Sequence, residues 1–207
     1  GHIVPMMVFA QKLAAASNVI VTFVNTHDSQ ARMSKASSLP SNIRFVQISD
    51  GLPVDYDRSA NFDQFTRSVD NMGDALTDLI TELQKSDTPI SCVIADSFLP
   101  WTFDVARKFH LPWVFFWTQS VAAYVFYTHL HQLISNGHFP PKKSDKIEYI
   151  AGLPTLQHED LPSFIQTGDA SDFVLQLIFR QFELVDKADW IVGNTIYELE
   201  SEAADSM

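Results

Sequence analysis

Runs of apolar, often β-branched residues alternate along this chain with segments whose apolar positions recur every three or four residues. The first pattern is typical of strands buried between two helical layers, and the second is typical of amphipathic helices. The apolar runs occupy residues 19–25, 43–48, 90–95, 112–117 and 190–194. Because helical patterns separate these runs, we expect parallel strands joined by right-handed crossovers, in a sheet covered on both faces.

The segments of helical periodicity lie mainly between the expected strands. They cover residues 6–13, 62–85, 101–109, 120–135 and 172–187. Pro5 stands at an early-turn position, where its missing N–H group does no harm, and Asn136-Gly137 marks a helix end. Thr195-x-x-Glu198 has the form of a capping box, so a final helix is predicted to open there.

These elements predict one α/β domain with a doubly wound, Rossmann-like parallel sheet over residues 1–207. A chain of 207 residues is long enough to bury a core of that size. It begins with Gly1 rather than Met and opens directly on a helix. We therefore expect that a first strand normally precedes this helix.

The charge balance and the single cysteine exclude several kinds of partner and site. Fourteen Lys and Arg residues stand against 25 Asp and Glu residues, which gives a net charge of −11 and no basic surface for nucleic acid or an anionic membrane. Cys92 is the only cysteine, so no intrachain disulfide or cysteine-based zinc cluster can form. The apolar stretch 112–126 falls short of the roughly 20 residues of a spanning helix. We expect a cytoplasmic protein without a membrane span.

Three common sequence signatures of enzymes are absent. The chain has no Gly-x-Gly-x-x-Gly, no Gly-x-x-x-x-Gly-Lys-Ser/Thr and no Gly-x-Ser-x-Gly. The sequence therefore lacks the motifs that usually form a dinucleotide-binding turn, a P-loop or a serine-hydrolase elbow.

The polar residues that follow the expected strands are the first candidates for a site. Ligands of an open parallel sheet bind beyond the carboxyl ends of its strands. His27-Asp28, Asp96 and Thr118 occupy such positions, and His2 joins them if a strand precedes it. A His and an Asp on the same edge of the sheet could meet there.

A histidine and an aspartate at this edge would suit general base catalysis. A neutral imidazole can take the proton of a hydroxyl group that attacks an electrophile, and a carboxylate on its other ring nitrogen fixes the tautomer and stabilises the imidazolium. The residues also allow a plainer interpretation, in which His2 is solvated and Asp96 caps a helix. The sequence pattern alone leaves both open.

Five short motifs, taken in order, resemble the amino-terminal, acceptor-binding half of the plant UDP-dependent glycosyltransferases. They are Gly1-His2-Ile3-Val4-Pro5, Asp96-Ser97-Phe98, Phe116-Trp117-Thr118, Gly152-Leu153-Pro154 with Asp160-Leu161-Pro162-Ser163-Phe164, and Gly193-Asn194-Thr195 with Glu198-Leu199-Glu200. Each motif is weak alone, but the ordered set spans the chain. The resemblance implies half of a GT-B arrangement, with the first strand and the carboxyl-terminal domain outside this chain.

The resemblance also implies an activity and a role for four residues. The activity is inverting transfer of a sugar from a UDP-sugar to a hydroxyl group of a small-molecule acceptor, without a metal ion or other cofactor. His2 would be the general base, Asp96 would orient it, Thr118 would touch the sugar donor and Phe98 would line the acceptor pocket. The family's nucleotide clamp lies in its second domain, so we expect little activity from these residues alone. The alternative is a non-catalytic α/β domain that binds an apolar small molecule.

Overall fold

The computed structural model describes residues 2–16, 18–33 and 40–207, with only the backbone of Arg32. Contacts within the chain gather into two compact units. The first comprises Gly1–Ala95 and Trp101–Trp113, and the second comprises Asp96–Pro100 and Val114–Met207. The expectation of one domain over residues 1–207 stays a prediction.

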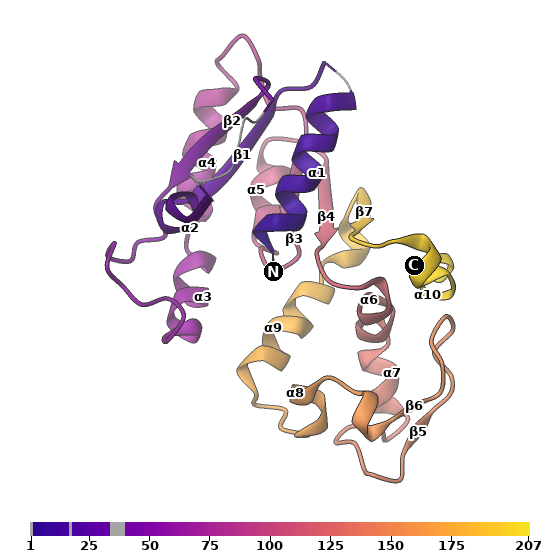
Figure 1. Cartoon of the computed structure of the whole chain (residues 1–207). Helices are drawn as coiled ribbons and strands as arrows, with labels where there is room; N and C mark the ends of the chain where they lie inside the picture. The colour runs from indigo at the N-terminus through magenta and orange to yellow at the C-terminus, as the bar shows by residue number, and fades with distance from the viewer. Residues whose placement is uncertain (1, 17, 34–39) are drawn as a thin grey trace. The chain divides into compact units, whose positions relative to one another are not determined.

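The first unit is built on two parallel strands. Its elements are α1 (Ile3–Ala16), β1 (Val21–Thr26), α2 (His27–Met33), β2 (Ile43–Ile48), α3 (Phe62–Asp70), α4 (Gly73–Leu83), most of β3 (Val93–Asp96) and α5 (Thr102–Lys108). Strands β1 and β2 pair from Val21 opposite Ile43 to Thr26 opposite Ile48. Helix α1 runs beside β1 (Figure 1). The hydrophobic pattern predicts all of these elements except α2 and the division between α3 and α4.

The single helix expected over residues 62–85 is two helices, and the expectation of one was wrong. The backbone N–H groups of Asn71 and Met72 donate to carbonyls three residues earlier, at Ser68 and Val69, so the four-residue ladder stops there. The Asn71 side chain donates to the carbonyl of Arg67 at 3.0 Å and closes the end of α3. Buried Met72 keeps the apolar face in phase across the break, which is why the periodicity suggested one helix.

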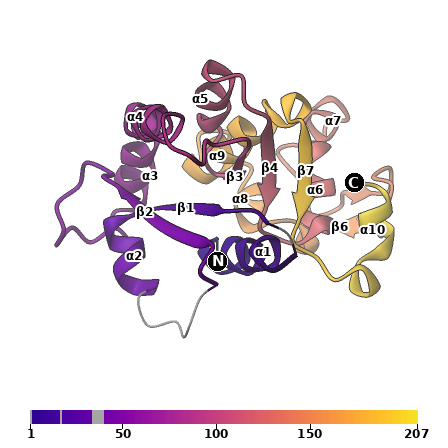
Figure 2. The ribbon, with the colours of Figure 1, turned by 90° about the horizontal axis from the view of Figure 1, so that it is seen from above.

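The second unit contains the rest of the described elements. They are β4 (Trp113–Trp117), of which all but Trp113 belongs to this unit, α6 (Val121–Thr128), α7 (Leu130–Ser135), β5 (Lys146–Ile147), β6 (Leu156–Gln157), α8 (Ser163–Gln166), α9 (Phe173–Phe182), β7 (Trp190–Gly193) and α10 (Ser201–Asp205), with short 3₁₀ turns at 158–160, 185–187 and 197–199. Strands β3, β4 and β7 form a sheet in that order. Strands β4 and β7 are parallel, from Val114 opposite Trp190 to Trp117 opposite Gly193 (Figure 2).

These strands and helices confirm the predicted α/β class with parallel, Rossmann-like pairing. The antiparallel pair β5–β6, only two residues long in each strand, lies outside the expected pattern. No helix of the described residues is both long and apolar enough to cross a membrane.

The helix expected over residues 120–135 also divides in two, at His129. The N–H group of His129 donates to Phe126, three residues back, while its ring Nδ1 lies 2.7 Å from the carbonyl oxygen of Val125. The ring therefore occupies the Val125 carbonyl oxygen, to which the backbone N–H of His129 would donate in a continuous helix. The expectation of one uninterrupted helix was wrong because this local side-chain bond competes with the backbone ladder.

An aromatic cluster forms the core of the second unit. Phe115 and Trp117, on one face of β4, pack with Tyr124, Tyr127 and Phe182 at centroid separations of 5.4–6.4 Å. Most of these pairs are tilted or edge-on, the geometry that favours the ring quadrupoles, and each such pair adds about 0.5–1.5 kcal/mol beyond area burial. Burial raises the pKa of Tyr127 well above its usual range. The end of β4, where Thr118 follows, is thus fixed to a rigid core.

The C-terminal helix α10 packs against a tight turn at Gly152. Gly152 has a φ of +81°, and a Cβ atom there would lie 2.3 Å from Ser206 Oγ and 2.6 Å from the carbonyl oxygen of Glu202. The second contact is with backbone, which cannot move aside cheaply. Glycine is therefore required here both for its backbone conformation and for the close approach of α10.

We expect Gly152→Ala to destabilise the protein more than Gly137→Ala. Both glycines have positive φ, +81° and +74°, so both substitutions cost about 1–2 kcal/mol of backbone strain. Only Gly152→Ala adds a steric clash, which costs about 1–3 kcal/mol more, because no atom lies within 4 Å of a Cβ at Gly137. Urea unfolding of the two variants measures the difference, and equal losses would contradict it.

Candidate functional site

Asp96 and Phe98 follow the carboxyl end of β3. Asp96 is the last residue of the strand and is buried, with 8% of its surface exposed, and its Oδ1 accepts a hydrogen bond from the Phe98 N–H at 2.9 Å. The carboxylate thus holds the turn that carries Phe98, which is half-buried. The N-cap of the following helix α5 is Trp101, so Asp96 does not cap it.

Thr118 lies at the carboxyl end of β4, where the chain is bonded to the end of β7. It is buried, and its carbonyl oxygen accepts a hydrogen bond of 3.1 Å from Asn194 Nδ2. The backbone N–H of Asn194 also donates to Trp117 O at 3.0 Å. Asn194 therefore holds two successive peptide carbonyls after the last paired residues of the strands.

The turn from β4 into α6 is held by its own side chains. Trp117 Nε1 donates to the carbonyl oxygen of Ser120 at 2.7 Å, across the turn that contains Thr118. Ser120 is the N-cap of α6, and its Oγ accepts from the Ala123 N–H at 3.3 Å. These bonds fix the backbone on both sides of Thr118.

Glu200 supplies the remaining bonds at the start of α6. Its Oε1 accepts from the Val121 N–H at 3.1 Å and its Oε2 from the Ala122 N–H at 3.0 Å. Thr195 Oγ1 donates to Glu200 Oε1 at 2.5 Å. The capping box expected between Thr195 and Glu198 is therefore wrong. The threonine hydroxyl pairs with the glutamate two residues further on, and that glutamate caps a helix 79 positions away in the sequence.

The electrostatics of this cap favour an ionised Glu200. Partial burial alone would raise its pKa, but the hydrogen bonds from Thr195 and from the N–H groups of Ala122 and Val121 outweigh burial and hold the pKa below the usual range of a glutamate. The amino end of a helix also carries about half a positive charge, which a carboxylate stabilises. Glu200 belongs to the last of the five motifs, but the sequence does not reveal its partners on α6, which are distant in the chain.

His2 belongs to the first unit and stands immediately before α1. It is half-buried, and its carbonyl oxygen accepts from the Met6 N–H at 3.4 Å, at the first turn of the helix. Gly1, the other half of the expected Gly-His turn, lies outside the described residues. Asp96, Phe98 and Thr118 all belong to the second unit. The pairing of His2 with Asp96 stays a prediction.

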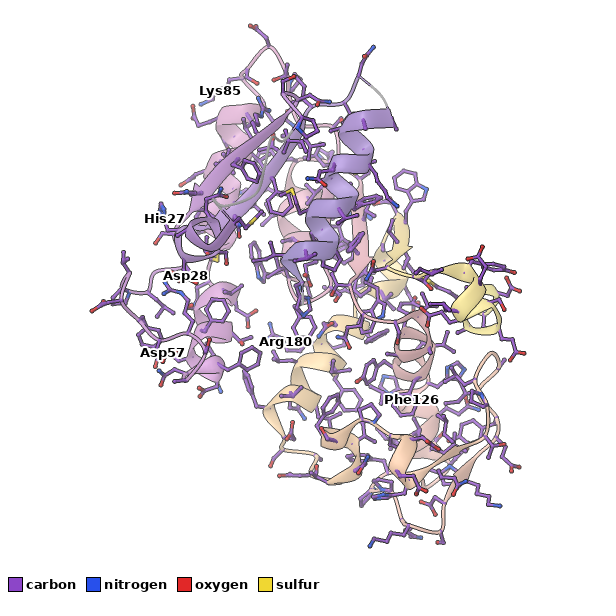
Figure 3. All side chains as sticks on the ribbon, viewed as in Figure 1. His27, Asp28, Asp57, Lys85, Phe126 and Arg180 are labelled. Carbon is purple, nitrogen blue, oxygen red and sulfur yellow. The ribbon has the colours of Figure 1, made fainter. Side chains whose placement is uncertain are left out.

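The carboxyl end of β1 carries the remaining candidates, His27 and Asp28. They begin α2 (Figure 3), and His27 Nδ1 lies 2.7 Å from Gln47 Oε1 on β2. A buried ion pair follows β2: Arg58 Nε and Nη2 donate to the two oxygens of Asp50 at 2.8 and 3.1 Å. Their side chains are only 6% and 4% exposed. This pair was not anticipated, because eight residues separate its members in a segment without periodic pattern.

Asp50 also organises the backbone around it. Its Oδ1 accepts from the Leu52 N–H at 3.1 Å, and Arg58 Nη1 donates to Tyr56 O at 3.1 Å. Burial opposes ionisation of Asp50, but the hydrogen bonds from Arg58 and Leu52 prevail and hold its pKa below the usual range. The pair and its backbone bonds thus tie together the segment 50–58 that follows β2.

Two buried polar side chains of the second unit have no hydrogen-bond partner among the described residues. They are the Ser97 hydroxyl and the Gln181 amide, each 1% exposed. Ser97 adjoins Asp96, which was a candidate from the sequence, whereas Gln181 lies within an amphipathic helix and carried no signal. In the described parts of the chain, no group of three or more His, Cys, Asp or Glu side chains is placed to hold a metal ion.

Known proteins match this chain over its whole length. No family model matches it. UDP-glycosyltransferase 86A1 of Arabidopsis thaliana is 35% identical, over 100% of this chain and 46% of the relative. The (R)-mandelonitrile beta-glucosyltransferase of Prunus dulcis is 34% identical, over 100% and 46% respectively. The chain spans about half the length of these curated relatives.

A solved structure shares the fold. Phytolacca americana UGT2, complexed with UDP-2fluoro-glucose and pterostilbene, superposes with a TM-score of 0.77 over 99% of this chain and 47% of that protein, at 19% identity. This likeness confirms the Rossmann-like, GT-B type of fold that the motif order implied.

We expect Asp50→Asn to destabilise the protein strongly at neutral pH. It leaves the Arg58 guanidinium buried without its counter-ion, which costs about 3–5 kcal/mol of unfolding free energy. Because the folded-state pKa of Asp50 is depressed, this stabilisation is present above the ordinary value of 3.8 and is lost as the pH falls through the folded value. Urea unfolding at pH 7 and at pH 3 measures both effects.

The double variant Asp50→Asn/Arg58→Met is the control for this pair. Since it removes both charges, it should lose less stability than the sum of the two single substitutions. Strict additivity would mean that the two side chains do not stabilise each other.

Proposed function

Because the chain belongs to the family of plant UDP-glycosyltransferases, we propose that it is the acceptor-binding part of an enzyme that transfers a sugar from a UDP-sugar to a hydroxyl group of a small organic molecule. The observation that carries this proposal is the match to such enzymes along the whole chain, at 35% identity with the Arabidopsis relative. The motifs around His2, Asp96 and Thr118 support it as an ordered set, since no single motif carries the resemblance.

In the proposed reaction, His2 acts as the general base. Its imidazole takes the proton of the acceptor hydroxyl while the oxygen attacks the anomeric carbon of the sugar. The bond from that carbon to the UDP oxygen breaks, UDP leaves with the electron pair, and the configuration at the carbon inverts. Asp96 keeps the imidazole in the tautomer that accepts the proton and stabilises the imidazolium that forms.

The other two residues position the substrates. Thr118 touches the sugar donor, a role suited to a residue whose backbone is bonded on both sides. Phe98 lines the acceptor pocket, and the hydrogen bond from its N–H to Asp96 links that pocket to the orienting carboxylate. No metal ion takes part in the proposed mechanism, because protein groups are proposed to neutralise the charge of the UDP leaving group.

The acceptor is proposed to be a small hydroxylated organic compound. One relative is named for (R)-mandelonitrile, and the solved neighbour was crystallised with pterostilbene. Both molecules combine a hydroxyl group with apolar, ring-containing surface. A pocket that includes Phe98 would bury such surface, and the acceptor would therefore bind largely through the hydrophobic effect.

The nucleotide is proposed to bind elsewhere in a longer protein. The relatives are about twice as long as the stretch that matches this chain. In our proposal, a second domain grips UDP and neutralises the charge of the leaving group. A cytoplasmic location also remains a proposal.

Replacement of His2 by Ala in the natural full-length protein should reduce the rate of sugar transfer by about 10²–10⁴-fold, because the acceptor hydroxyl loses its base. Initial rates with UDP-glucose and a panel of phenolic and terpenoid alcohols measure the effect. His131→Ala, an exposed histidine on α7, is the matched control and should leave the rate unchanged. Normal turnover by the His2 variant would contradict the role of His2 as the general base.

The 207-residue chain alone should show little transferase activity. Without a second domain nothing would position the UDP leaving group or stabilise its charge. The release of UDP from UDP-glucose, compared at equal concentration with the full-length protein, measures this difference. Comparable turnover by the isolated chain would overturn the proposal that a second domain binds UDP.

A further inference from the structure

The start of helix α6 is bonded by a side chain from the far end of the second unit. Glu200 spans the Val121 and Ala122 N–H groups with its two oxygens, at 3.1 and 3.0 Å. Thr195 Oγ1 donates to the same carboxylate. Two of the amides that a helix amino end usually offers to water or an anion are therefore already taken, and the third is bonded to Ser120 Oγ.

This cap lies next to Thr118 in the chain. Only Gln119 and Ser120 separate Thr118 from Val121, and Trp117 Nε1 bridges the turn to Ser120 O. The Thr118 carbonyl is bonded to Asn194, which directly precedes Thr195. The segment 194–200 thus contacts the turn at both of its ends. Asn194 is bonded to the carbonyl groups at its start, and Glu200 is bonded to the N–H groups that follow Ser120.

We propose that Glu200 is a positioning residue for the sugar donor. Its carboxylate fixes the amino end of α6, and with it the turn that presents Thr118. The inference rests on the proposed role of Thr118 at the donor. A side chain that must meet a substrate within a fraction of an ångström depends on the backbone that carries it, and a displacement of about 1 Å can cost about 10²-fold in rate.

The carboxylate of Glu200 also makes the amino end of α6 unavailable to the phosphates of the donor. Because the carboxylate neutralises the positive end of α6, this helix does not offer its amides to the phosphates of UDP. The phosphates must then be held by other groups, which agrees with a nucleotide clamp in a second domain. We therefore expect Glu200 to act on the donor by fixing the turn that carries Thr118, and not by direct contact with the phosphates.

The test is a comparison of Michaelis constants in the natural full-length protein. Glu200→Ala should raise the KM for UDP-glucose about tenfold, the effect of a displaced hydrogen bond, and leave the acceptor KM within about twofold. Glu200→Gln keeps one accepting oxygen for the α6 amides and should recover part of the loss. Glu198→Gln, the same charge change at an exposed residue two positions earlier, is the matched control and should behave as the unaltered protein.

A purely structural role gives a different result. It would lower the yield or the melting temperature of the Glu200 variants and leave both KM values unchanged, and this outcome would overturn the inference. If Glu200→Ala does not fold, Thr195→Val removes one bond to the carboxylate and tests the same expectation with a smaller rise in the donor KM. An unaltered protein that turns over no UDP-sugar would refute the proposed function itself, which separates the two failures.

Discussion

The second unit depends on the complete burial of strand β4. Its five residues have 0–6% of their surfaces exposed, so both faces are covered and the strand lies between β3 and β7. In such a position every backbone N–H and C=O must find a partner within the protein. The sheet supplies these partners along the strand, and Asn194 and Ser97 supply them where it ends. Thr118, which is proposed to touch the sugar donor, stands where that pairing stops.

The hydrogen bonds beyond the sheet therefore have two roles at once. Asn194 satisfies the carbonyls of Trp117 and Thr118, and in doing so sets the course of the chain toward α6. Glu200 satisfies the first amides of that helix and fixes where it begins. Backbone groups that a buried strand end would leave unpaired are thus the same groups that orient the turn. Stability and positioning arise here from one set of contacts.

The sequence predicts the strands and most of the helices because each has a distinct hydrophobic pattern of its own. Residues 113–117 are apolar throughout, and α9 has apolar residues at helical spacing, so both are found without knowledge of their neighbours. The same pattern overlooks the helix breaks at Asn71 and His129. In both places local bonds interrupt the backbone ladder, while the apolar residues continue in phase on either side.

The site could be anticipated only in part. Asp96 and Thr118 become candidates because strand ends can be located from the sequence and the motifs recur in a known family. The bonds from the α6 amides to Glu200 have no such signal, because they join segments 79 positions apart. The Asp50–Arg58 pair has none because it lies in a segment without periodic pattern. Thr195 shows the limit clearly: its spacing from Glu198 suggested a local capping box, but its hydroxyl is bonded to Glu200.

The burial of the Asp50–Arg58 pair determines how the segment after β2 responds to ionic strength. Dissolved ions screen charges that face water, such as Lys85 and Glu82, whose side chains are 65% and 72% exposed. They screen a pair with 6% and 4% exposure much less. We therefore expect added salt to weaken the Asp50–Arg58 pair less than the Lys85–Glu82 pair.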